Sequence, residues 1–394
     1  MSGPLLLGID EGTTAVKAAL FGTDLRVVAE ARRSLAVAHP QPDWVEQDPE
    51  EILEAVVDAV AEVLEQREGR MVIGAGLDHQ GESVLAWDAL SKRALSRVIV
   101  WQDKRQVALL SELDAAIASR SGLPLDPYFS AGKLAWLAAN EEAVRSARAA
   151  GTLRMGTVDA FLCDRLGGRF ASDLSTASRT QLLAVGGRDW DAELLASFDL
   201  RREWLPALGP SFGELGVLRH ERWDIELPLT AQLVDQQAAL AGSGAVLPGE
   251  LKASYGTGVF VLCLTEGERA PAGLLPTVAW GAPDERGDLG ELTRALDGGV
   301  FSAGSLLEWL AGGLGLADDV PGLMRAAGSV PDSAGVLVLP ALSGLGAPWW
   351  EPRARGVIAG LHAGVSSAHL ARAAIEGIAW RVVEIVEALG VATP

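Results

Sequence analysis

The sequence predicts an α/β protein of two domains in which similar β-meanders flank a cleft. Two turns that contain glycine and threonine favour this fold, Gly8–Thr14 in the first half of the chain and Ser254–Phe260 in the second. Each turn leads into an apolar segment that is typical of a buried strand. A length of 394 residues also exceeds what one ordinary hydrophobic core supports. The pattern therefore indicates a structural repeat, with one meander in each domain.

The first half begins with a meander and continues with alternating strands and helices. Asp48, followed by Pro49 and two glutamates, predicts a helix that continues to Glu65, because acidic residues favour the positive end of a helix dipole. Strands are expected at Leu5–Asp10, Val16–Phe21, Val27–Ala31, Val72–Leu77, Val84–Trp87 and Val98–Trp101, the last two as a hairpin. Helices are expected at Val107–Ile117, Gly132–Ala139, Glu141–Ala149, Asp159–Leu166 and Ala192–Phe198.

The second half repeats the strand–turn–strand pattern after a junction. Leu229–Val234 predicts a strand that ends where a helix begins at Asp235. The glycine-rich segment Ala241–Glu250 predicts the junction, so the expected domains are residues 1–243 and 244–394. Beyond it we expect strands within Lys252–Leu264 and at Val336–Pro340, and helices at Ser302–Leu310 and Ser366–Leu389.

Composition disfavours several classes of function. A net charge of −19 argues against nucleic acid as a partner, since binding to phosphate backbones needs clustered lysine and arginine. The sequence shows neither a secretory signal nor about 18 consecutive apolar residues, so we expect a cytoplasmic protein without a membrane partner. Cys163 and Cys263 lie in separate apolar segments without CxxC spacing, which predicts buried free thiols.

The two turns predict a phosphate clamp that closes from both sides of the cleft. Glycine lets the backbone approach an anion closely, and threonine adds hydroxyl and N–H donors. Asp10 ends a strand beside the first turn, where it would hold Mg²⁺ through water. An aspartate that caps a turn is the structural alternative for this residue. Together these features point to an ATP-dependent phosphotransferase.

Asp235 is the candidate catalytic residue. It follows an apolar strand and begins a helix, so its carboxylate would face the cleft. Phosphoryl transfer to an alcohol needs a base that accepts the hydroxyl proton. An aspartate at a helix N-terminus also has a purely structural explanation, which stays open at this point.

Many ordered motifs resemble those of the FGGY carbohydrate kinases, and within that family the glycerol kinases are the most similar. These motifs are Leu7–Leu20, Trp44–Asp48, Val98–Gln102, Asp126–Ser130, Ala177–Thr180, Asp235–Gln237, Tyr255–Gly258 and Ser343–Trp350. The resemblance implies the ATPase fold of actin, hexokinase and the heat-shock chaperones, which has two ribonuclease-H-like domains. It also implies ATP and Mg²⁺ as cofactors, a small polyol or sugar as substrate and a homodimer.

The resemblance also implies roles for individual residues. Asp235 would be the general base, and Asp10 would hold the metal. The substrate would contact Glu82, Trp101, Tyr128, Asp235, Gln236 and Phe260, and the nucleotide would contact Thr13, Thr14, Lys17, Gly256, Thr257 and Gly258. Each of four residues also has a structural alternative. Trp101 and Phe260 could be core aromatics, Tyr128 could anchor a loop, and Glu82 could be a solvated acid. Without the resemblance, these alternatives would be favoured.

Two departures from the family pattern affect these expectations. Glycerol kinases carry an arginine at the position of Gly81, so the site would lose a fork of donors and gain space. Family members also extend further and hold adenosine on a later glycine-rich turn, so the second domain is expected to be incomplete. The apolar residues of Ser366–Leu389 would then be covered by a partner or partly disordered, and ATP would bind weakly.

Three functions therefore compete. An ATP:polyol or ATP:sugar phosphotransferase explains the motifs Asp10, Glu82, Asp235 and Thr257. A catalytically impaired relative that binds a polyol or a partner protein is the second possibility. A chaperone-like or actin-like ATPase is disfavoured, because Trp101, Tyr128 and Gln236 would then have no role.

Overall fold

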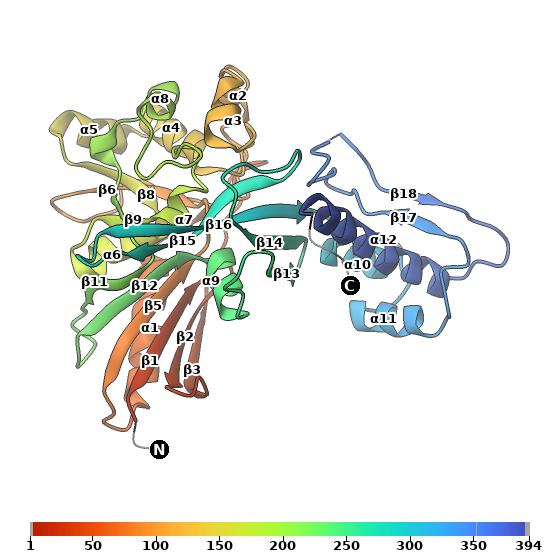
Figure 1. The fold of residues 1–394 in the computed structure, drawn as a ribbon, viewed down its shortest axis with the longest axis horizontal. Helices are drawn as coiled ribbons and strands as arrows, with labels where there is room; N and C mark the ends of the chain where they lie inside the picture. Colours follow the sequence, from red (N-terminus) through yellow and green to blue (C-terminus); the bar gives the residue numbers. More distant parts are fainter. Residues whose placement is uncertain (1–2, 352, 391–394) are drawn as a thin grey trace. The chain divides into compact units, whose positions relative to one another are not determined.

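The computed structural model describes residues 3–351 and 353–390, which form two compact units (Figure 1). Unit 1 contains the residues up to Ala239 together with Thr277–Arg294. Unit 2 contains Leu240–Pro276 and the residues from Ala295 onward. The outer ends of the two expected domains, residues 1–2 and 391–394, lie outside the described part of the chain.

Unit 1 is built on a mixed six-stranded sheet with the order β11-β12-β5-β1-β2-β3. Its strands are β1 (Leu5–Glu11), β2 (Ala15–Gly22), β3 (Val27–Ser34), β5 (Val72–His79), β11 (Phe212–Leu218) and β12 (Leu227–Val234). β1, β2 and β3 form the expected antiparallel meander. β5 lies parallel to both β1 and β12. The carboxyl ends of β1, β5 and β12 therefore meet at one edge of the sheet.

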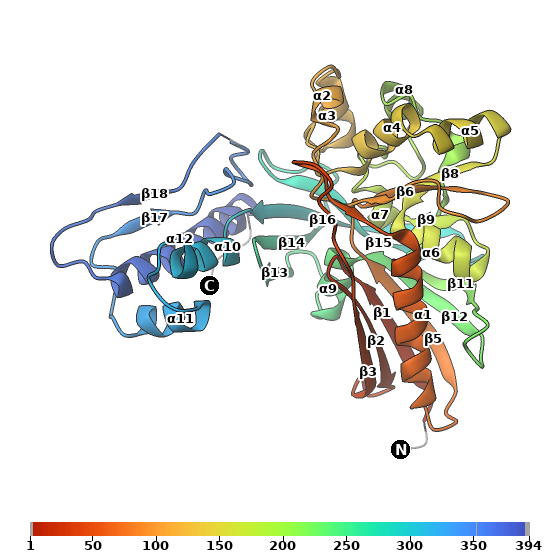
Figure 2. The same cartoon turned by 180° about the vertical axis from the view of Figure 1, so that it is seen from behind.

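Helices α1 (Pro49–Glu65) and α6 (Val158–Gly167) pack with this sheet in one hydrophobic core (Figure 2). α1 begins and ends as its sequence predicts, because Asp48 accepts a hydrogen bond from the Glu50 N–H and Pro49 occupies the first turn. Ile52 and Val56 of α1 are fully buried with Phe161 of α6. The burial of this apolar face fixes the sheet on which the site is built.

A second sheet in unit 1 has the order β4-β7-β6-β8. Its strands are β4 (Glu46–Gln47), β7 (Val98–Ile99), β6 (Val84–Asp88) and β8 (Leu153–Thr157). β6 and β7 pair antiparallel, which confirms the expected hairpin. The remaining elements before β11 are α2 (Val107–Leu110), α3 (Ala116–Ser121), α4 (Ser130–Asn140), α5 (Glu142–Ala150), β9 (Ala171–Asp173), α7 (Leu174–Ala177), α8 (Ala192–Ser197), the 3₁₀ helix η1 (Arg202–Trp204) and β10 (Ala207–Gly209).

The single helix expected over Val107–Ile117 is wrong, because the structure has the two short helices α2 and α3 there. Asp114 lies between them, and its Oδ1 accepts a hydrogen bond from the Ala116 N–H at 2.7 Å. An aspartate that binds a backbone N–H two residues ahead favours a new start over a continuous helix.

Unit 2 contains most of a four-stranded sheet with the order β13-β14-β16-β15. The strands of this sheet are β13 (Leu251–Tyr255), β14 (Val259–Thr265), β15 (Leu275–Pro283) and β16 (Leu289–Val300), of which most of β15 and the first half of β16 belong to unit 1. Unit 2 further contains α10 (Gly304–Glu308), the π-helical segment η2 (Trp309–Gly313), α11 (Val320–Gly328), β17 (Leu337–Leu339), β18 (Val357–Ala359) and α12 (Ser367–Ala388). The strand–turn–strand expected over Lys252–Leu264 is confirmed. α9 (Asp235–Gly242) follows β12 as expected.

Helix α12 fixes the loop that contains Ser343–Trp350. Arg381 Nη2 donates to the Ala347 carbonyl at 2.6 Å, and Trp349 Nε1 donates to Glu384 at 3.1 Å. Ile378 and Ile385 of the expected apolar face are buried in the core of unit 2, whereas Ala379 is exposed. None of the helices in the described ranges is long and apolar enough to cross a membrane. Cys163 and Cys263 are free and buried, as expected.

Candidate active site

Three carboxylates lie at the carboxyl ends of neighbouring parallel strands. Asp10 on β1 is paired in register with Asp78 on β5. Asp235 follows β12 directly, and the last residue of that strand, Val234, is paired with His79. The sheet thus brings together two predicted site residues and one that sequence reasoning missed. The available signal was that Asp78, like Asp10, stands at the end of a buried strand.

The electrostatics of this cluster favour a bound cation. Burial and then the charges of Asp10 and Asp235 raise the pKa of Asp78 well above its usual range. Lys17 Nζ lies 2.9 Å from Asp10 Oδ2, but their side chains are 51% and 39% exposed, so this ion pair is a weak one. Within residues 3–351 and 353–390, no three acidic, histidine or cysteine side chains form a metal-binding group. The pair Asp10 and Asp78 nevertheless fits Mg²⁺, which takes one or two carboxylates and completes its shell with water and phosphate.

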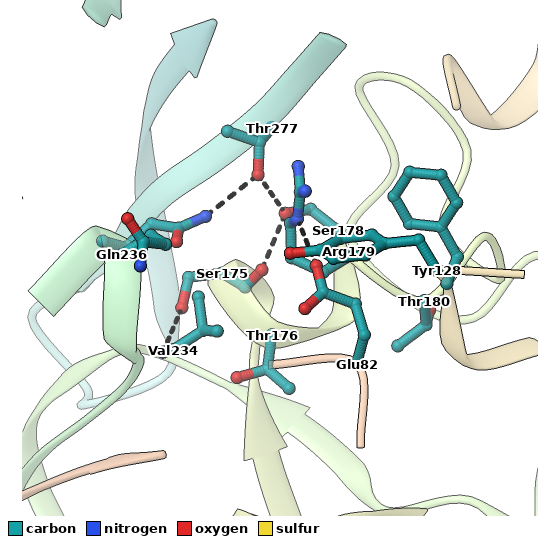
Figure 3. Close-up of polar contacts among 12 residues, drawn as sticks. Glu82, Tyr128, Ser175, Thr176, Ser178, Arg179, Thr180, Val234, Gln236 and Thr277 are labelled. Carbon is teal, nitrogen blue, oxygen red and sulfur yellow. Dashed lines mark hydrogen bonds and ion pairs between the residues drawn. The ribbon is translucent and has the colours of Figure 1, made fainter. Parts of the chain in front are cut away.

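Glu82 and Arg179 form a buried ion pair beside this cluster (Figure 3). Arg179 Nε donates to Glu82 Oε1 at 2.8 Å, and both side chains are less than a tenth exposed. Burial raises the pKa of Glu82 even though Arg179 opposes the rise, and the charge of Asp235 contributes to it. Glu82 also has a φ of 60°, a strained conformation for a residue other than glycine. Such strain clusters at functional sites, which supports a role for Glu82 in binding.

Two predicted substrate aromatics meet next to this ion pair. The rings of Trp101 and Tyr128 pack edge to face with their centroids 5.6 Å apart. The Arg179 guanidinium lies 5.9 Å from the centre of the Tyr128 ring. Trp101, Tyr128, Glu82 and Asp235 therefore gather at one place in unit 1. Arg179 was noted in a sequence motif without a role, and the fold places it at the centre of this group.

The start of α9 is fixed by side-chain hydrogen bonds. Gln236 donates its backbone N–H to Asp235 Oδ1 at 2.7 Å. Gln237 is buried, and its Nε2 donates to the Thr277 hydroxyl at 3.1 Å. The Thr277 hydroxyl in turn lies 2.8 Å from the Ser178 hydroxyl (Figure 3). These bonds orient the helix whose first residue is Asp235.

Lys133 is a further charged residue beside the site that sequence reasoning missed. Its buried Nζ donates to the backbone carbonyls of Pro127, Tyr128 and Phe129 at 2.8, 2.6 and 3.1 Å. Burial lowers the pKa of Lys133 to about 7, although Glu82, Asp103 and Asp126 oppose the shift. Lys133 thus fixes the backbone that presents the Tyr128 ring.

The lowered pKa of Lys133 predicts a pH dependence of stability. Between the folded pKa of about 7 and the unfolded value of 10.5, the unfolded chain binds more protons, so stability rises with pH. Relative to Lys133→Met, the wild-type chain should gain about 1 kcal/mol per pH unit in that window. Urea unfolding at pH 7.5 and 9 measures this difference, with the exposed Lys104→Met as control. Equal pH slopes for wild type and Lys133→Met would contradict it.

The two predicted phosphate turns lie in different units. In unit 1, the Thr13 hydroxyl is bonded to Gln80 and Trp101, whereas Thr14 is exposed. In unit 2, the carbonyls of Gly256 and Thr257 accept hydrogen bonds from Gly304 and Ala303 at 2.9 and 3.0 Å. Thr257 is exposed, Gly258 is buried and Phe260 on β14 is half-buried. Joint binding of phosphates by the two turns stays a prediction.

Comparison with known proteins identifies the family. Residues 5–242 match the N-terminal domain of the FGGY family of carbohydrate kinases, and residues 251–393 match its C-terminal domain. A glycerol kinase from Citrifermentans bemidjiense is 40% identical over 395 residues, which cover 98% of this chain and 79% of that protein. A glycerol kinase from Gloeobacter violaceus is 41% identical over 393 residues, covering 98% of this chain and 77% of that protein.

Solved structures agree with this result. The glycerol kinase of Plasmodium falciparum with ADP superposes with a TM-score of 0.91 at 29% identity, covering 99% of this chain and 80% of that one. A xylulose kinase from Brucella ovis superposes with a TM-score of 0.86 at 29% identity, covering 99% and 80%. These neighbours confirm the expected ATPase fold of actin and hexokinase, and they favour the catalytic interpretation over the impaired one. The chain belongs to the FGGY family of carbohydrate kinases, enzymes that use ATP to phosphorylate a hydroxyl of a sugar or polyol.

Proposed function

We propose that Asp235 is the general base of this kinase and that the substrate is a small polyol or a sugar of similar size. The observation that most supports the role of Asp235 is its position at the N-terminus of α9. There it lies close enough to Glu82 that its charge raises the pKa of Glu82. The helix N-terminus stabilises an ionised carboxylate, which is the state that a base requires. The Asp235 carboxylate accepts the proton of the substrate hydroxyl, the oxygen attacks the γ-phosphorus of ATP, and ADP leaves.

The neighbouring side chains bind and orient the substrate. Glu82, whose Oε1 is paired with Arg179, accepts hydrogen bonds from substrate hydroxyls. Gln236 offers an amide beside the base. The edge-to-face pair of Trp101 and Tyr128 packs against the C–H faces of the carbon skeleton. Phe260 on β14 is a further predicted contact of the substrate.

Phosphate binding is predicted for the glycine–threonine turn of each unit and for a metal ion. The residues that contribute are Thr13, Thr14, Lys17, Gly256, Thr257 and Gly258. Asp10, with Asp78 as a second carboxylate, is the place for Mg²⁺. When bound, this ion supplies positive charge that stabilises the transferring phosphoryl group.

Gly81 and Val234 together set the substrate side of the site. The sequence predicted that glycine at position 81 opens space, but a Cβ there would lie only 2.6 Å from Val234 Cγ2. The volume next to Gly81 is therefore taken by a valine methyl group. Gly81 and Val234 form an apolar surface, which we call the wall of the site. Val234 is itself buried and directly precedes Asp235. We propose that the substrate presents a C–H group, and no hydroxyl, to this wall.

Substitution of both wall residues tests this assignment. Gly81→Arg alone should lower kcat/KM for all substrates, because its Cβ overlaps Val234. Gly81→Arg with Val234→Ala removes the overlap and supplies guanidinium donors, so it should raise the kcat/KM for glycerol relative to ribitol by about tenfold. A coupled ADP-release assay over glycerol, ribitol, xylitol and D-xylulose measures both ratios. If the double variant keeps the wild-type order of substrates, the wall does not determine specificity.

The same assay on the wild-type chain tests the proposed function as a whole. We expect ADP release that depends on both the acceptor and Mg²⁺, above the rate without an acceptor. Release that is independent of every acceptor in the panel would contradict the proposed substrate class.

A further inference from the structure

We infer that a closed ring of hydrogen bonds couples the substrate side of the site to the first phosphate turn. The bond from the Trp101 indole N–H to the Thr13 hydroxyl connects the two sides. This inference rests on the proposed function, because it takes Trp101 as a substrate contact and the turn at Thr13 as a phosphate contact. It makes Thr13 a positioning residue, whose hydroxyl acts through Trp101 and Gln80.

The ring begins and ends at Trp101. The Trp101 backbone N–H donates to the Ser83 hydroxyl at 3.1 Å, and that hydroxyl donates to Gln80 Oε1 at 3.0 Å. The Thr13 hydroxyl donates to the same Gln80 oxygen at 3.3 Å. Trp101 Nε1 donates to Thr13 Oγ1 at 3.0 Å and closes the ring. Both nitrogen atoms of Trp101 are thus tied to one amide oxygen through one hydroxyl each.

Gln80 is held in place from its other end. Its Nε2 donates to Glu11 Oε1 at 2.7 Å and to Gln47 Oε1 at 2.9 Å. Gln47 Nε2 donates to the Thr13 carbonyl at 2.8 Å, so both the side chain and the backbone of Thr13 are connected to Gln80. Gln80, Glu11 and Gln47 are each at most 2% exposed. In such a buried and satisfied network, moving one member weakens the bonds of the others.

The single hydroxyl hydrogen of Thr13 argues against donation from this hydroxyl to a phosphate. A threonine hydroxyl has one hydrogen, and that hydrogen is donated to Gln80. Donation to a phosphate would require the hydroxyl to leave Gln80. Phosphate contacts are therefore left to the exposed Thr14 and to N–H groups of the turn other than that of Gly12, which donates to the Ala15 carbonyl at 3.1 Å. The Thr13 hydroxyl fixes the turn to Trp101.

This connection predicts that each substrate strengthens the binding of the other. An acceptor that packs on Trp101 restrains the indole, which restrains the Thr13 turn in its phosphate-binding conformation. By linkage, the nucleotide must then strengthen acceptor binding by the same factor. Since the bond from Trp101 Nε1 to Thr13 Oγ1 is the one direct hydrogen bond of the ring between these two side chains, and it is neutral, we expect a factor of about fivefold.

Two substitutions remove that bond. Trp101→Phe keeps an aromatic ring for the acceptor and loses the indole N–H. Thr13→Val is nearly isosteric and loses the hydroxyl. Calorimetry gives the Kd of Mg–AMP-PNP with and without the panel acceptor of highest kcat/KM, and the Kd of that acceptor with and without Mg–AMP-PNP. For each ligand, the ratio is its Kd without the other ligand divided by its Kd with it. In the wild type this ratio should be about fivefold, and it should fall to near one in each variant and in the double variant.

The controls separate this inference from the proposed function. Thr13→Ser keeps the hydroxyl and should keep the ratio, and Thr14→Val should weaken nucleotide binding without changing the ratio. Trp101→Ala should weaken acceptor binding, and its failure to do so would contradict the proposed role of Trp101. A wild-type ratio of one, or a ratio unchanged in both Trp101→Phe and Thr13→Val, would overturn the coupling.

Discussion

Replacement of Asp235 by asparagine should lower kcat by about 10²- to 10⁴-fold, the range expected for the loss of a general base. Asparagine has nearly the same shape and still occupies the first position of α9, but it accepts no proton. Acceptor affinity should remain within a few-fold of the wild-type value, since Glu82, Trp101 and Tyr128 are unchanged. Steady-state ADP release gives kcat, and calorimetry gives the acceptor Kd.

A matched substitution shows whether this loss is specific. Asp24→Asn removes a carboxylate from the exposed turn after β2 and should leave kcat unchanged. If Asp235→Asn retained more than about a tenth of the wild-type kcat, Asp235 would not be the base. A large loss of acceptor affinity with unchanged kcat would instead make Asp235 a binding residue.

Replacement of Arg179 by methionine should lower the free energy of unfolding by about 3–5 kcal/mol, as expected when one member of a buried ion pair is removed. Glu82 would then be a buried acid without its guanidinium at 2.8 Å. The ring contacts of Arg179 with Tyr128 and Phe129 would also be lost. Urea unfolding of the wild type and the variant measures the difference in the free energy of unfolding.

The pH dependence of this loss identifies its cause. Burial already raises the pKa of Glu82, and removal of Arg179 raises it further. The folded variant then binds more protons than the unfolded chain, so its stability falls as pH rises above the unfolded value of 4.5. The penalty should be larger at pH 8 than at pH 5.5, and Glu82→Gln with Arg179→Met should be less pH-dependent. A penalty that is the same at both pH values would indicate lost packing instead.

Much of the fold was predictable because local signals and tertiary contacts agree. The helix α1 follows from Asp48 and Pro49 at its start and from apolar spacing along its length. The first meander follows from the apolar segments that precede and follow the Gly8–Thr14 turn. The prediction failed at Val107–Ile117, where a side-chain bond of Asp114 begins a second helix. Strands such as β8 and β11 were missed, because short strands with mixed composition carry little periodic signal.

The candidate site divides in the same way. The sequence by itself determined the family and the two glycine–threonine turns, because these depend on ordered motifs, and it predicted Asp10, Glu82 and Asp235 as site residues. Only the tertiary structure placed Asp78 beside Asp10, Arg179 on Glu82 and Val234 against Gly81. These pairs join residues that are far apart in the chain, and pairing of distant strands decides which side chains meet. The Thr13 hydroxyl shows the same limit, since its motif predicts a phosphate contact whereas its bonds to Gln80 and Trp101 depend on the packed fold.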